Sequence, residues 1–329
     1  MTMGIPSVLP CRLALALLGA LITTGALAQG AWPSRPVKFI VPFAPGGGAD
    51  ATARILALEM SKTLGQQVII ESRGGGGGTI GVAAGMKSPP DGYTVFLGTP
   101  GPIAVSPTLV PDLPYDPTRD MAPVSRLSTA SLLMAVPGSS SIRSLQELIA
   151  TARAKPGSLS YATGGNGTSH HLAGELLQQM TGTHMTHVPY KGTSPATTDT
   201  LAGQVAMGII DLHSALPLVR SGKLRSIGTT GGNRSPFAPD IATIAESGLP
   251  GFDVTTWFIM GAPAGVPRDI ITRLNAEVVR ALAIPEVRDR ILATGNEANS
   301  SSPEELGAFV RDEIARWAKV IKTSGVKAG

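Results

Sequence analysis

Cysteine, aromatic residues and charge are all scarce in this sequence, and each scarcity excludes a class of protein. The 329 residues include one cysteine, which excludes a disulfide framework and a cysteine-rich metal site. Phe, Trp and Tyr number 7, 3 and 4, which is few for stacking on bases or sugars. Only 15% of residues are charged, and the net charge of +4 includes no basic run, which argues against a nucleic-acid binder. The 43% of hydrophobic residues and the 40 glycines are instead typical of a globular, loop-rich protein.

Long apolar runs are scarce too, and the one clear run lies near the N-terminus. Arg12 precedes an apolar stretch, Leu13 to Leu27, that closes on Ala26-Leu27-Ala28. A basic residue, an apolar core and a small-x-small end are the parts of a secretory signal peptide, and the core is shorter than the roughly 20 residues of a membrane helix. We predict a signal peptide over residues 1–28, whose cleavage removes Cys11. An uncleaved membrane anchor is the alternative.

Short strand-like runs alternate with helical runs from residue 37 onward. Residues 37–43 predict a buried strand, and the following helix repeats apolar residues on one face through Leu64. Further strands at 67–71 and 93–97 complete a strand-helix-strand-helix-strand series, which predicts an α/β fold with a parallel sheet covered on both faces. A second series of strands is predicted at residues 132–136, 159–162, 185–188, 205–210 and 224–229, and the C-terminal part is predicted to be helical.

Two segments rich in Pro, Gly or Ser, Pro114–Val124 and Asn233–Phe252, suggest crossovers between two lobes. We predict a discontinuous lobe 1 over residues 29–125 plus 246–329, and lobe 2 over residues 126–245. Two crossovers make a hinge, and a hinge places a cleft between the lobes. Ligands of parallel sheets bind at the carboxyl ends of strands, so the loops that follow strands are the candidates for a site.

The most informative of these loops is residues 42–50, PFAPGGGAD, which we call the first loop. Gly46, Gly47 and Gly48 permit positive φ and remove side chains that would block the backbone, and Asp50 is predicted to be the N-cap of the next helix. Backbone N–H groups at such a helix start, together with the positive end of the helix dipole, suit a carboxylate or phosphate. An ordinary strand-to-helix turn with no ligand is the alternative.

Residues 161–177, YATGGNGTSHHLAGELL, repeat this arrangement. Gly164 to Gly167 follow a strand, and Thr168 and Ser169 are predicted to cap a helix; we call Gly164–Ser169 the second loop. If one loop lies in each lobe, both helix N-termini face one cleft, which fits a dicarboxylate or one carboxylate held from both sides. Thr99 and Asp211 also end predicted strands, and Asp211 is either an acceptor for a ligand hydroxyl, ammonium or water, or a strand-end cap.

Three rival site chemistries find weaker support. Gly46-x-Gly48-x-x-Ala51 followed by Glu71 matches the relaxed dinucleotide fingerprint, but prolines interrupt the passage from strand to glycines. Ser169 beside His170 suggests a nucleophile and base, yet no Gly-x-Ser-x-Gly elbow is present. Four histidines suggest a metal, but neighbouring helix positions diverge by about 100° and positions three apart on a strand face opposite sides. We therefore expect no catalytic residue, no metal and no cofactor. The four histidines are His170, His171, His184 and His187.

The chain resembles the Bug receptors, the extracytoplasmic substrate-binding proteins of tripartite tricarboxylate transporters. The likeness covers essentially all of the mature chain and rests on several long segments in the same order. These are WPSRPVKFIVPFAPGGGAD (32–50), PPDGYTVFLGT (89–99), LPYDPTRDMAPVS (113–125), YATGGNGTSHHLAGELL (161–177), HVPYKG (187–192), RSPFAPDIATIAESGLPGF (234–252) and EIARWAKVIKTSGVKA (313–328).

The resemblance implies a type II periplasmic-binding-protein fold, in which two α/β lobes with a hinge close on a small carboxylate in an interdomain ligand cleft. It implies no catalysis, a periplasmic location, and membrane subunits of a tripartite transporter as partners; we expect a monomer. A sensor that docks on a two-component system and a secreted dinucleotide-dependent oxidoreductase are the alternatives. The chain departs from its relatives at Gly74–Gly78, where they usually carry an Asn-Arg-Pro-Gly-Ala-Gly-Gly-like run. The predicted ligand-binding residues are Phe43, Ala44, Gly46, Gly47, Asp50, Thr99, Gly165, Thr168, Ser169 and Asp211.

Overall fold

The computed structural model describes residues 1–2, 32–190 and 192–324, so the predicted signal peptide lies almost entirely outside the described residues. The residues from Arg35 onward form one compact unit, which is the one considered below. No helix in the described part of the chain combines the length and the apolar character that a membrane span requires.

The first strands form a parallel set, as the alternating pattern predicts. Strand β1 (Val37–Val41) pairs in parallel with β2 (Val68–Ser72) on one side and with β3 (Thr94–Gly98) on the other. Helix α2 (Gly48–Leu64) connects β1 to β2, and α3 (Thr79–Met86) precedes β3. The parallel order places the carboxyl ends of β1 and β3 at the same edge of the sheet, which is where the first loop and Thr99 lie.

A second parallel set follows in the middle of the chain. Strand β5 (Ser160–Thr163) lies between β6 (Thr186–Pro189) and β7 (Met207–Asp211), and all three run in the same direction. Helices α7 (Ser169–Thr181) and α8 (Thr193–Leu201) make the crossovers. The second loop and Asp211 therefore lie together at the carboxyl edge of this set.

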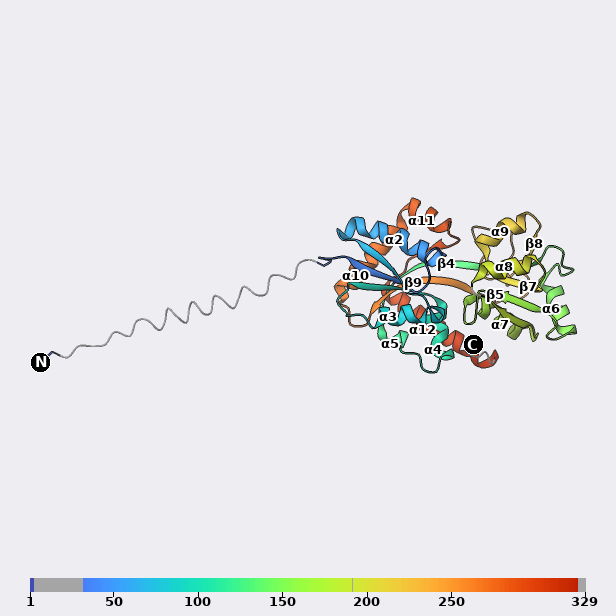
Figure 1. The fold of residues 1–329 in the computed structure, drawn as a ribbon, viewed down its shortest axis with the longest axis horizontal. Helices are drawn as coiled ribbons and strands as arrows, with labels where there is room; N and C mark the ends of the chain where they lie inside the picture. The colour runs from blue at the N-terminus through green and yellow to red at the C-terminus, as the bar shows by residue number, and fades with distance from the viewer. Residues whose placement is uncertain (3–31, 191, 325–329) are drawn as a thin grey trace. The chain divides into compact units, whose positions relative to one another are not determined.

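Two long antiparallel strands join the parallel sets into one sheet of order β2-β1-β3-β9-β4-β7-β5-β6. Strand β4 (Met121–Pro137) pairs with β9 (Thr255–Pro263) as far as Ser131, and from Leu132 it pairs with β7. Figure 1 shows β4 and β9 running between the two halves of the sheet. The lobe limits given above stay a prediction, while the exchange of strand partners occurs inside β4.

The first half of β4 and all of β9 were not predicted as strands. Residues 114–124 were predicted to be a crossover and no strand was predicted in the C-terminal part, yet Met121 already pairs with Pro263. The apolar pattern is misleading here because β9 is buried on both faces from Trp257 onward and shows no alternation. A buried run without alternation cannot be assigned to strand or helix by periodicity alone.

The remaining elements cover the sheet. Around β9, the buried carboxylate of Glu313 accepts hydrogen bonds from the indole nitrogens of Trp257 (2.9 Å) and Trp317 (3.1 Å), which ties the last helix to this strand. Ser302 and Glu305 form a capping box at the start of that helix, because they exchange side-chain-to-backbone bonds of 2.8 and 3.1 Å. The other elements are η1 (Gly76–Gly78), η2 (Gly101–Val105), α4 (Ser106–Leu109), α5 (Pro117–Asp120), α6 (Leu145–Ala154), α9 (Leu212–Arg220), β8 (Leu224–Thr229), α10 (Arg268–Ala283), α11 (Pro285–Leu292), β10 (Glu297–Ala298) and α12 (Pro303–Ser324).

Candidate ligand-binding cleft

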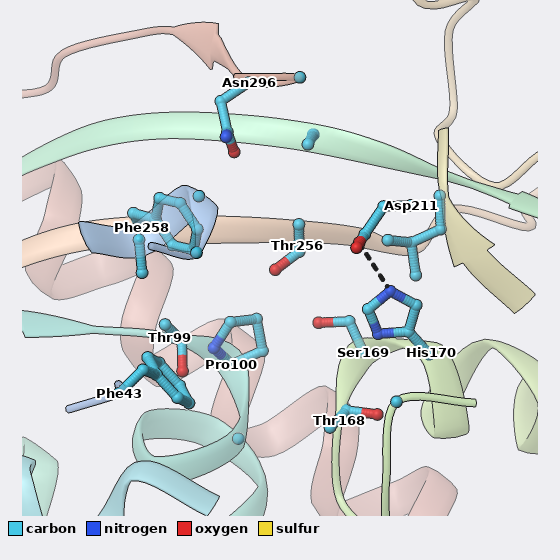
Figure 2. Close-up of a pocket in the computed structure, with 18 of the residues that line it drawn as sticks. Phe43, Thr99, Pro100, Thr168, Ser169, His170, Asp211, Thr256, Phe258 and Asn296 are labelled. Carbon is cyan, nitrogen blue, oxygen red and sulfur yellow. Dashed lines mark hydrogen bonds and ion pairs between the residues drawn. The ribbon is translucent and has the colours of Figure 1, made fainter. Parts of the chain in front are cut away.

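A cleft with a volume of about 660 Å³ is lined by the carboxyl edges of both parallel sets and by the two long strands. Of the predicted site residues, the ones that line it are Phe43, Gly47, Thr99, Gly165, Thr168, Ser169 and Asp211. Figure 2 shows lining residues from several elements turned toward this space, among them Ser169, Thr256 and Asn296. The structure thus brings together most of the residues that the sequence singled out. Three of them, Ala44, Gly46 and Asp50, are not part of the lining.

The first loop presents the start of α2 to the cleft. Gly47 is the N-cap, with extended backbone and no side-chain cap, and Gly47, Gly48 and Ala49 all line the cleft. The first N–H groups of a helix have no acceptor inside the helix, and they lie at the positive end of its dipole. This end of the cleft therefore offers backbone donors without any cationic side chain.

The prediction that Asp50 is the N-cap of this helix is wrong. The helix begins at Gly48, so Asp50 is its third residue, and its buried carboxylate accepts from the Gly46 N–H (3.0 Å) and from Arg54 Nε (2.9 Å). The hydrogen bond from Arg54 keeps the pKa of Asp50 below its usual value despite the opposing effect of burial. The Asp50 side chain therefore stabilises the first loop by accepting a hydrogen bond from the backbone of Gly46. Ala44 and Gly46 lie on the exposed side of the same loop.

The second loop presents the start of α7 from the other half of the sheet. Thr168 is the N-cap, as predicted; its Oγ1 accepts from the His171 N–H (3.3 Å) and donates to the Gly165 carbonyl (2.8 Å). Ser169, the other predicted cap, is instead the first helical residue and is 5% exposed. Gly165 and Gly167 have φ of +132° and +70°, a region that strongly favours glycine. The loop and the first helical residues through His170 all line the cleft.

Asp211 ends β7 and forms the polar centre of the second half of the cleft. His170 Nε2 lies 3.0 Å from its Oδ1, as the dashed line in Figure 2 shows, and the Thr193 hydroxyl donates to Oδ2. Burial raises the pKa of Asp211, but the bonds from His170 and Thr193 outweigh it, so the net pKa lies below the usual value and the group is ionised at neutral pH. Asp211 makes no side-chain cap of α9, and 47% of its side chain is exposed to the cleft.

Several lining residues were missed by the sequence reasoning. Thr256 and Phe258 come from β9, and Ala130, Ser131 and Leu132 come from the part of β4 where the strand changes partner. Because β9 was not recognised as a strand, nothing local marked its residues. The segment Thr294-Gly295-Asn296 after α11 also lines the cleft, and the only signal for it was a glycine beside an amide in a loop.

Charge in the cleft is sparse. Within the described part of the chain the lining contains no Lys or Arg, and its ionisable groups are Asp211, His170 and His213. No group of three or more His, Cys, Asp or Glu residues is placed to hold a metal ion in residues 32–190 and 192–324. An anion bound here would be neutralised by backbone N–H groups and helix dipoles, since no cationic Lys or Arg side chain is at hand.

The geometry also bears on the rival chemistries. Glu71, the candidate ribose-binding acid, is paired with Lys38 at 2.7 Å and with Arg73, and it does not line the cleft. His170 turns its Nε2 to Asp211, and no hydrogen bond joins it to Ser169 among the described residues. Glu71 therefore lies outside the cleft, and His170 is paired with Asp211 and not with Ser169.

A family model, curated sequences and solved structures were found to be similar to this chain. Residues 52–326 match the model of the family described as "Tripartite tricarboxylate transporter family receptor". The chain is 38% identical to protein BugT of Bordetella pertussis over 95% of this chain and 98% of that protein. It is similar to an R. palustris protein solved with adipate (TM-score 0.80, 38% identity, 90% of this chain and 99% of the other). It is also similar to MatC from Rhodopseudomonas palustris with bound malate (TM-score 0.77, 34% identity, 88% of this chain and 100% of the other).

These likenesses extend to the fold. The periplasmic binding protein BugD superimposes with a TM-score of 0.77 at 34% identity over 90% of this chain and 99% of its own. The predicted two-lobe periplasmic-binding-protein fold is thereby confirmed. The protein belongs to the tripartite tricarboxylate transporter receptor family, whose Bug-type members its sequence and its fold both resemble.

Proposed function

We propose that this protein is a periplasmic receptor that captures a small organic carboxylate in the cleft by lobe closure and delivers it to the membrane subunits of a tripartite transporter. The observation that supports this most directly is that the N-termini of α2 and α7, from opposite halves of the sheet, line one cleft without a Lys or Arg. The volume of about 660 Å³ is in the range usual for sites that take small molecules.

The cleft offers donors to a carboxylate from both sides. Gly48 and Ala49 line the cleft at the start of α2, and Ser169 and His170 line it at the start of α7, where helix N–H groups have no acceptor inside the helix. A helix dipole contributes about 0.3–1 kcal/mol to holding an anion, and each charge-assisted hydrogen bond about 1.5–3 kcal/mol. Three or four such bonds would account for micromolar affinity without a cationic side chain.

The far end of the ligand would meet Asp211. Because that carboxylate is ionised, it suits a hydroxyl or ammonium donor and disfavours a second carboxylate in direct contact. Similar proteins have been solved with adipate and with malate, which supports an organic acid as the ligand class. We infer a solute receptor with no turnover that acts as a monomer.

Calorimetric titration with a panel of mono-, di- and hydroxycarboxylates, including malate and adipate, tests this proposal. We expect at least one acid to bind with 1:1 stoichiometry and to remain chemically unchanged after prolonged incubation. If no acid in the panel gives heat or a thermal shift, the receptor function is wrong. Chemical conversion of the bound acid would instead show an enzyme.

The variant Gly47→Val, with Ala44→Val as its control, tests whether the start of α2 binds the ligand. A Cβ at Gly47 meets no atom within 4 Å and the position has no positive φ, so the variant should fold normally while its side chain covers the N–H groups of α2. Binding should weaken by at least tenfold, which corresponds to the loss of a single charge-assisted bond. Ala44→Val, on the exposed side of the same loop, is the control and should bind like the wild type. Unchanged affinity in Gly47→Val would show that the anion site is wrongly placed.

A further inference from the structure

Behind the second loop lies a column of three rings that takes no part in the cleft lining. Tyr161 of β5 stacks on His187 of β6 with a centroid distance of 5.0 Å, and His187 stacks on His171 of α7 at 3.9 Å with the planes 7° apart. Tyr161 is fully buried and His171 is 5% exposed. Neither imidazole touches the cleft, so the ligand-binding role proposed above leaves both unexplained.

His171 is bonded directly to the second loop, and His187 contacts it through Thr163, the last residue of β5. His171 Nδ1 accepts a hydrogen bond from the Gly167 N–H at 3.2 Å. His187 Nε2 lies 2.6 Å from Thr163 Oγ1, and the same oxygen accepts from the Gly165 N–H at 3.2 Å. The two glycines with positive φ in this loop are therefore the two whose N–H groups are held from behind.

The charge state of the column follows from its acid partner. Glu175 Oε1 accepts from the Tyr161 hydroxyl at 2.6 Å and lies 3.6 Å from His171 Nε2. Burial raises the pKa of Glu175, but the bonds from His171 and Tyr161 outweigh it and leave the pKa below its usual value. An ionised Glu175 favours a proton on His171 Nε2, which leaves Nδ1 free to accept from Gly167. Burial lowers the pKa of His187 to about 4, so His187 is neutral at neutral pH.

We propose that His171 and His187 are positioning residues that hold the second loop in its cleft-lining conformation, with Glu175 selecting the tautomer of His171 that makes this possible. The importance of that hold for the ligand rests on the proposed function, because the loop supplies one of the two groups of backbone donors. The glycines allow the loop its conformation. The bond from Gly167 to His171, and the bond from Gly165 to the Thr163 hydroxyl that His187 contacts, select that conformation from the others open to a glycine-rich segment.

Nuclear magnetic resonance of the ligand-free protein tests the proposal without any assumption about the ligand. Long-range ¹⁵N–¹H spectra should show His171 protonated at Nε2 and unprotonated at Nδ1. In His171→Phe, which keeps a stacked ring but has no acceptor, the Gly167 amide should exchange with solvent about tenfold faster, as expected for the loss of one neutral hydrogen bond. The Leu172 amide, bonded to the Thr168 carbonyl, should be unaffected and reports that the helix start is intact.

His171→Asn is the rescue variant, because its side-chain oxygen can occupy the position of Nδ1. It should restore slow Gly167 exchange, and it keeps the test decisive if His171→Phe does not fold. A proton on Nδ1 in the wild type, or equal Gly167 exchange in the wild type and His171→Phe, would overturn the proposal.

Titration with malate and adipate separates this proposal from the proposed function. If an acid binds the wild type, His171→Phe should bind it about tenfold more weakly and His171→Asn within about twofold. If neither these acids nor the wider panel binds the wild type, the receptor function fails, while the tautomer and the exchange rates still decide the role of the histidines. Tight binding by His171→Phe would show that the hold on Gly167 does not matter to the ligand.

Discussion

Gly295 and His213 lie close together across the cleft, so a single added methyl group at Gly295 can test the proposed lobe closure. Gly295 follows α11 in the half of the sheet that contains β1, whereas His213 belongs to α9 in the half that contains β7, and both line the cleft. A Cβ at Gly295 would lie 2.4 Å from the Cβ of His213, where ordinary contacts begin at 3.4 Å. In Gly295→Ala the two segments must therefore separate by about 1 Å, since the distance falls short by that amount.

The cost of this clash depends on whether the lobes are closed. Overpacking of this size costs about 1–3 kcal/mol in a well-packed contact. In the lobe closure proposed above, an open form would avoid the clash, so the cost would apply to the closed, ligand-holding form and should raise the Kd by roughly 5- to 150-fold. Gly295 also has φ of +87°, and a side chain there costs a further ~1–2 kcal/mol that lowers stability in open and closed forms alike.

A double-mutant cycle separates the clash from the backbone strain. Calorimetric titration with the tightest acid of the panel should show a large loss of affinity in Gly295→Ala and a much smaller loss when His213→Gly is already present, because the second substitution removes the Cβ that the added methyl group would meet. Gly295→Ala should lower the midpoint temperature of thermal unfolding by a similar amount in both backgrounds, since the backbone strain at φ of +87° is the same. Equal losses of affinity in the two backgrounds, or no loss in either, would refute closure through this contact.

Two further predictions concern buried titratable groups. Glu277 lies where α10 packs on α2; it is 4% exposed and is paired with Arg273 (2.9 Å) and Arg280 (3.1 Å) of its own helix. Glu277→Ala should lower the free energy of unfolding, measured in urea, by about 1–3 kcal/mol. This range is reduced because both arginines are partly exposed. Glu277→Gln should lower the free energy of unfolding by a smaller amount. A urea midpoint equal to that of the wild type in Glu277→Ala would contradict the stabilising role of these ion pairs. Burial lowers the pKa of His187 from the ordinary value of 6.5 to about 4. Between these two pH values the unfolded chain binds a proton at His187 and the folded protein does not. Stability should therefore fall by about 1–2 kcal/mol, discounted for partial exposure, as the pH drops through this window, and His187→Gln should flatten the profile; an unchanged profile in that variant would show that His187 does not titrate in this way.

Local signals were enough to predict the two glycine-rich loops that line the cleft. Gly46 to Gly48 and Gly164 to Gly167 each follow an apolar strand and precede an amphipathic helix, and a few consecutive residues carry that information. Thr168 is the N-cap that the sequence indicates, and the parallel order of β1, β2 and β3 follows from the alternation of strands and helices. The sequence also predicted that both loops meet in one cleft, through the argument that carboxyl ends of parallel strands share an edge.

Non-local pairing was beyond the reach of such signals. Strand β9 is buried on both faces and its partners β3 and β4 are distant in sequence, so Thr256 and Phe258 carried no mark of their place in the cleft. The start of α2 differed from the prediction because Gly48 and Ala49 adopt helical backbone, which turned Asp50 from a cap into a group that closes the loop from behind.

The sequence by itself determined the fold class, the family resemblance and the two glycine-rich loops that precede helices, because these depend on short-range periodicity, glycine and capping residues. Only the tertiary structure decided which side chains surround those donors. It placed Asp211 against His170 and Thr193, His171 and His187 behind the second loop, and Gly295 against His213, since each of these contacts joins elements whose spacing along the chain encodes nothing about their distance in space.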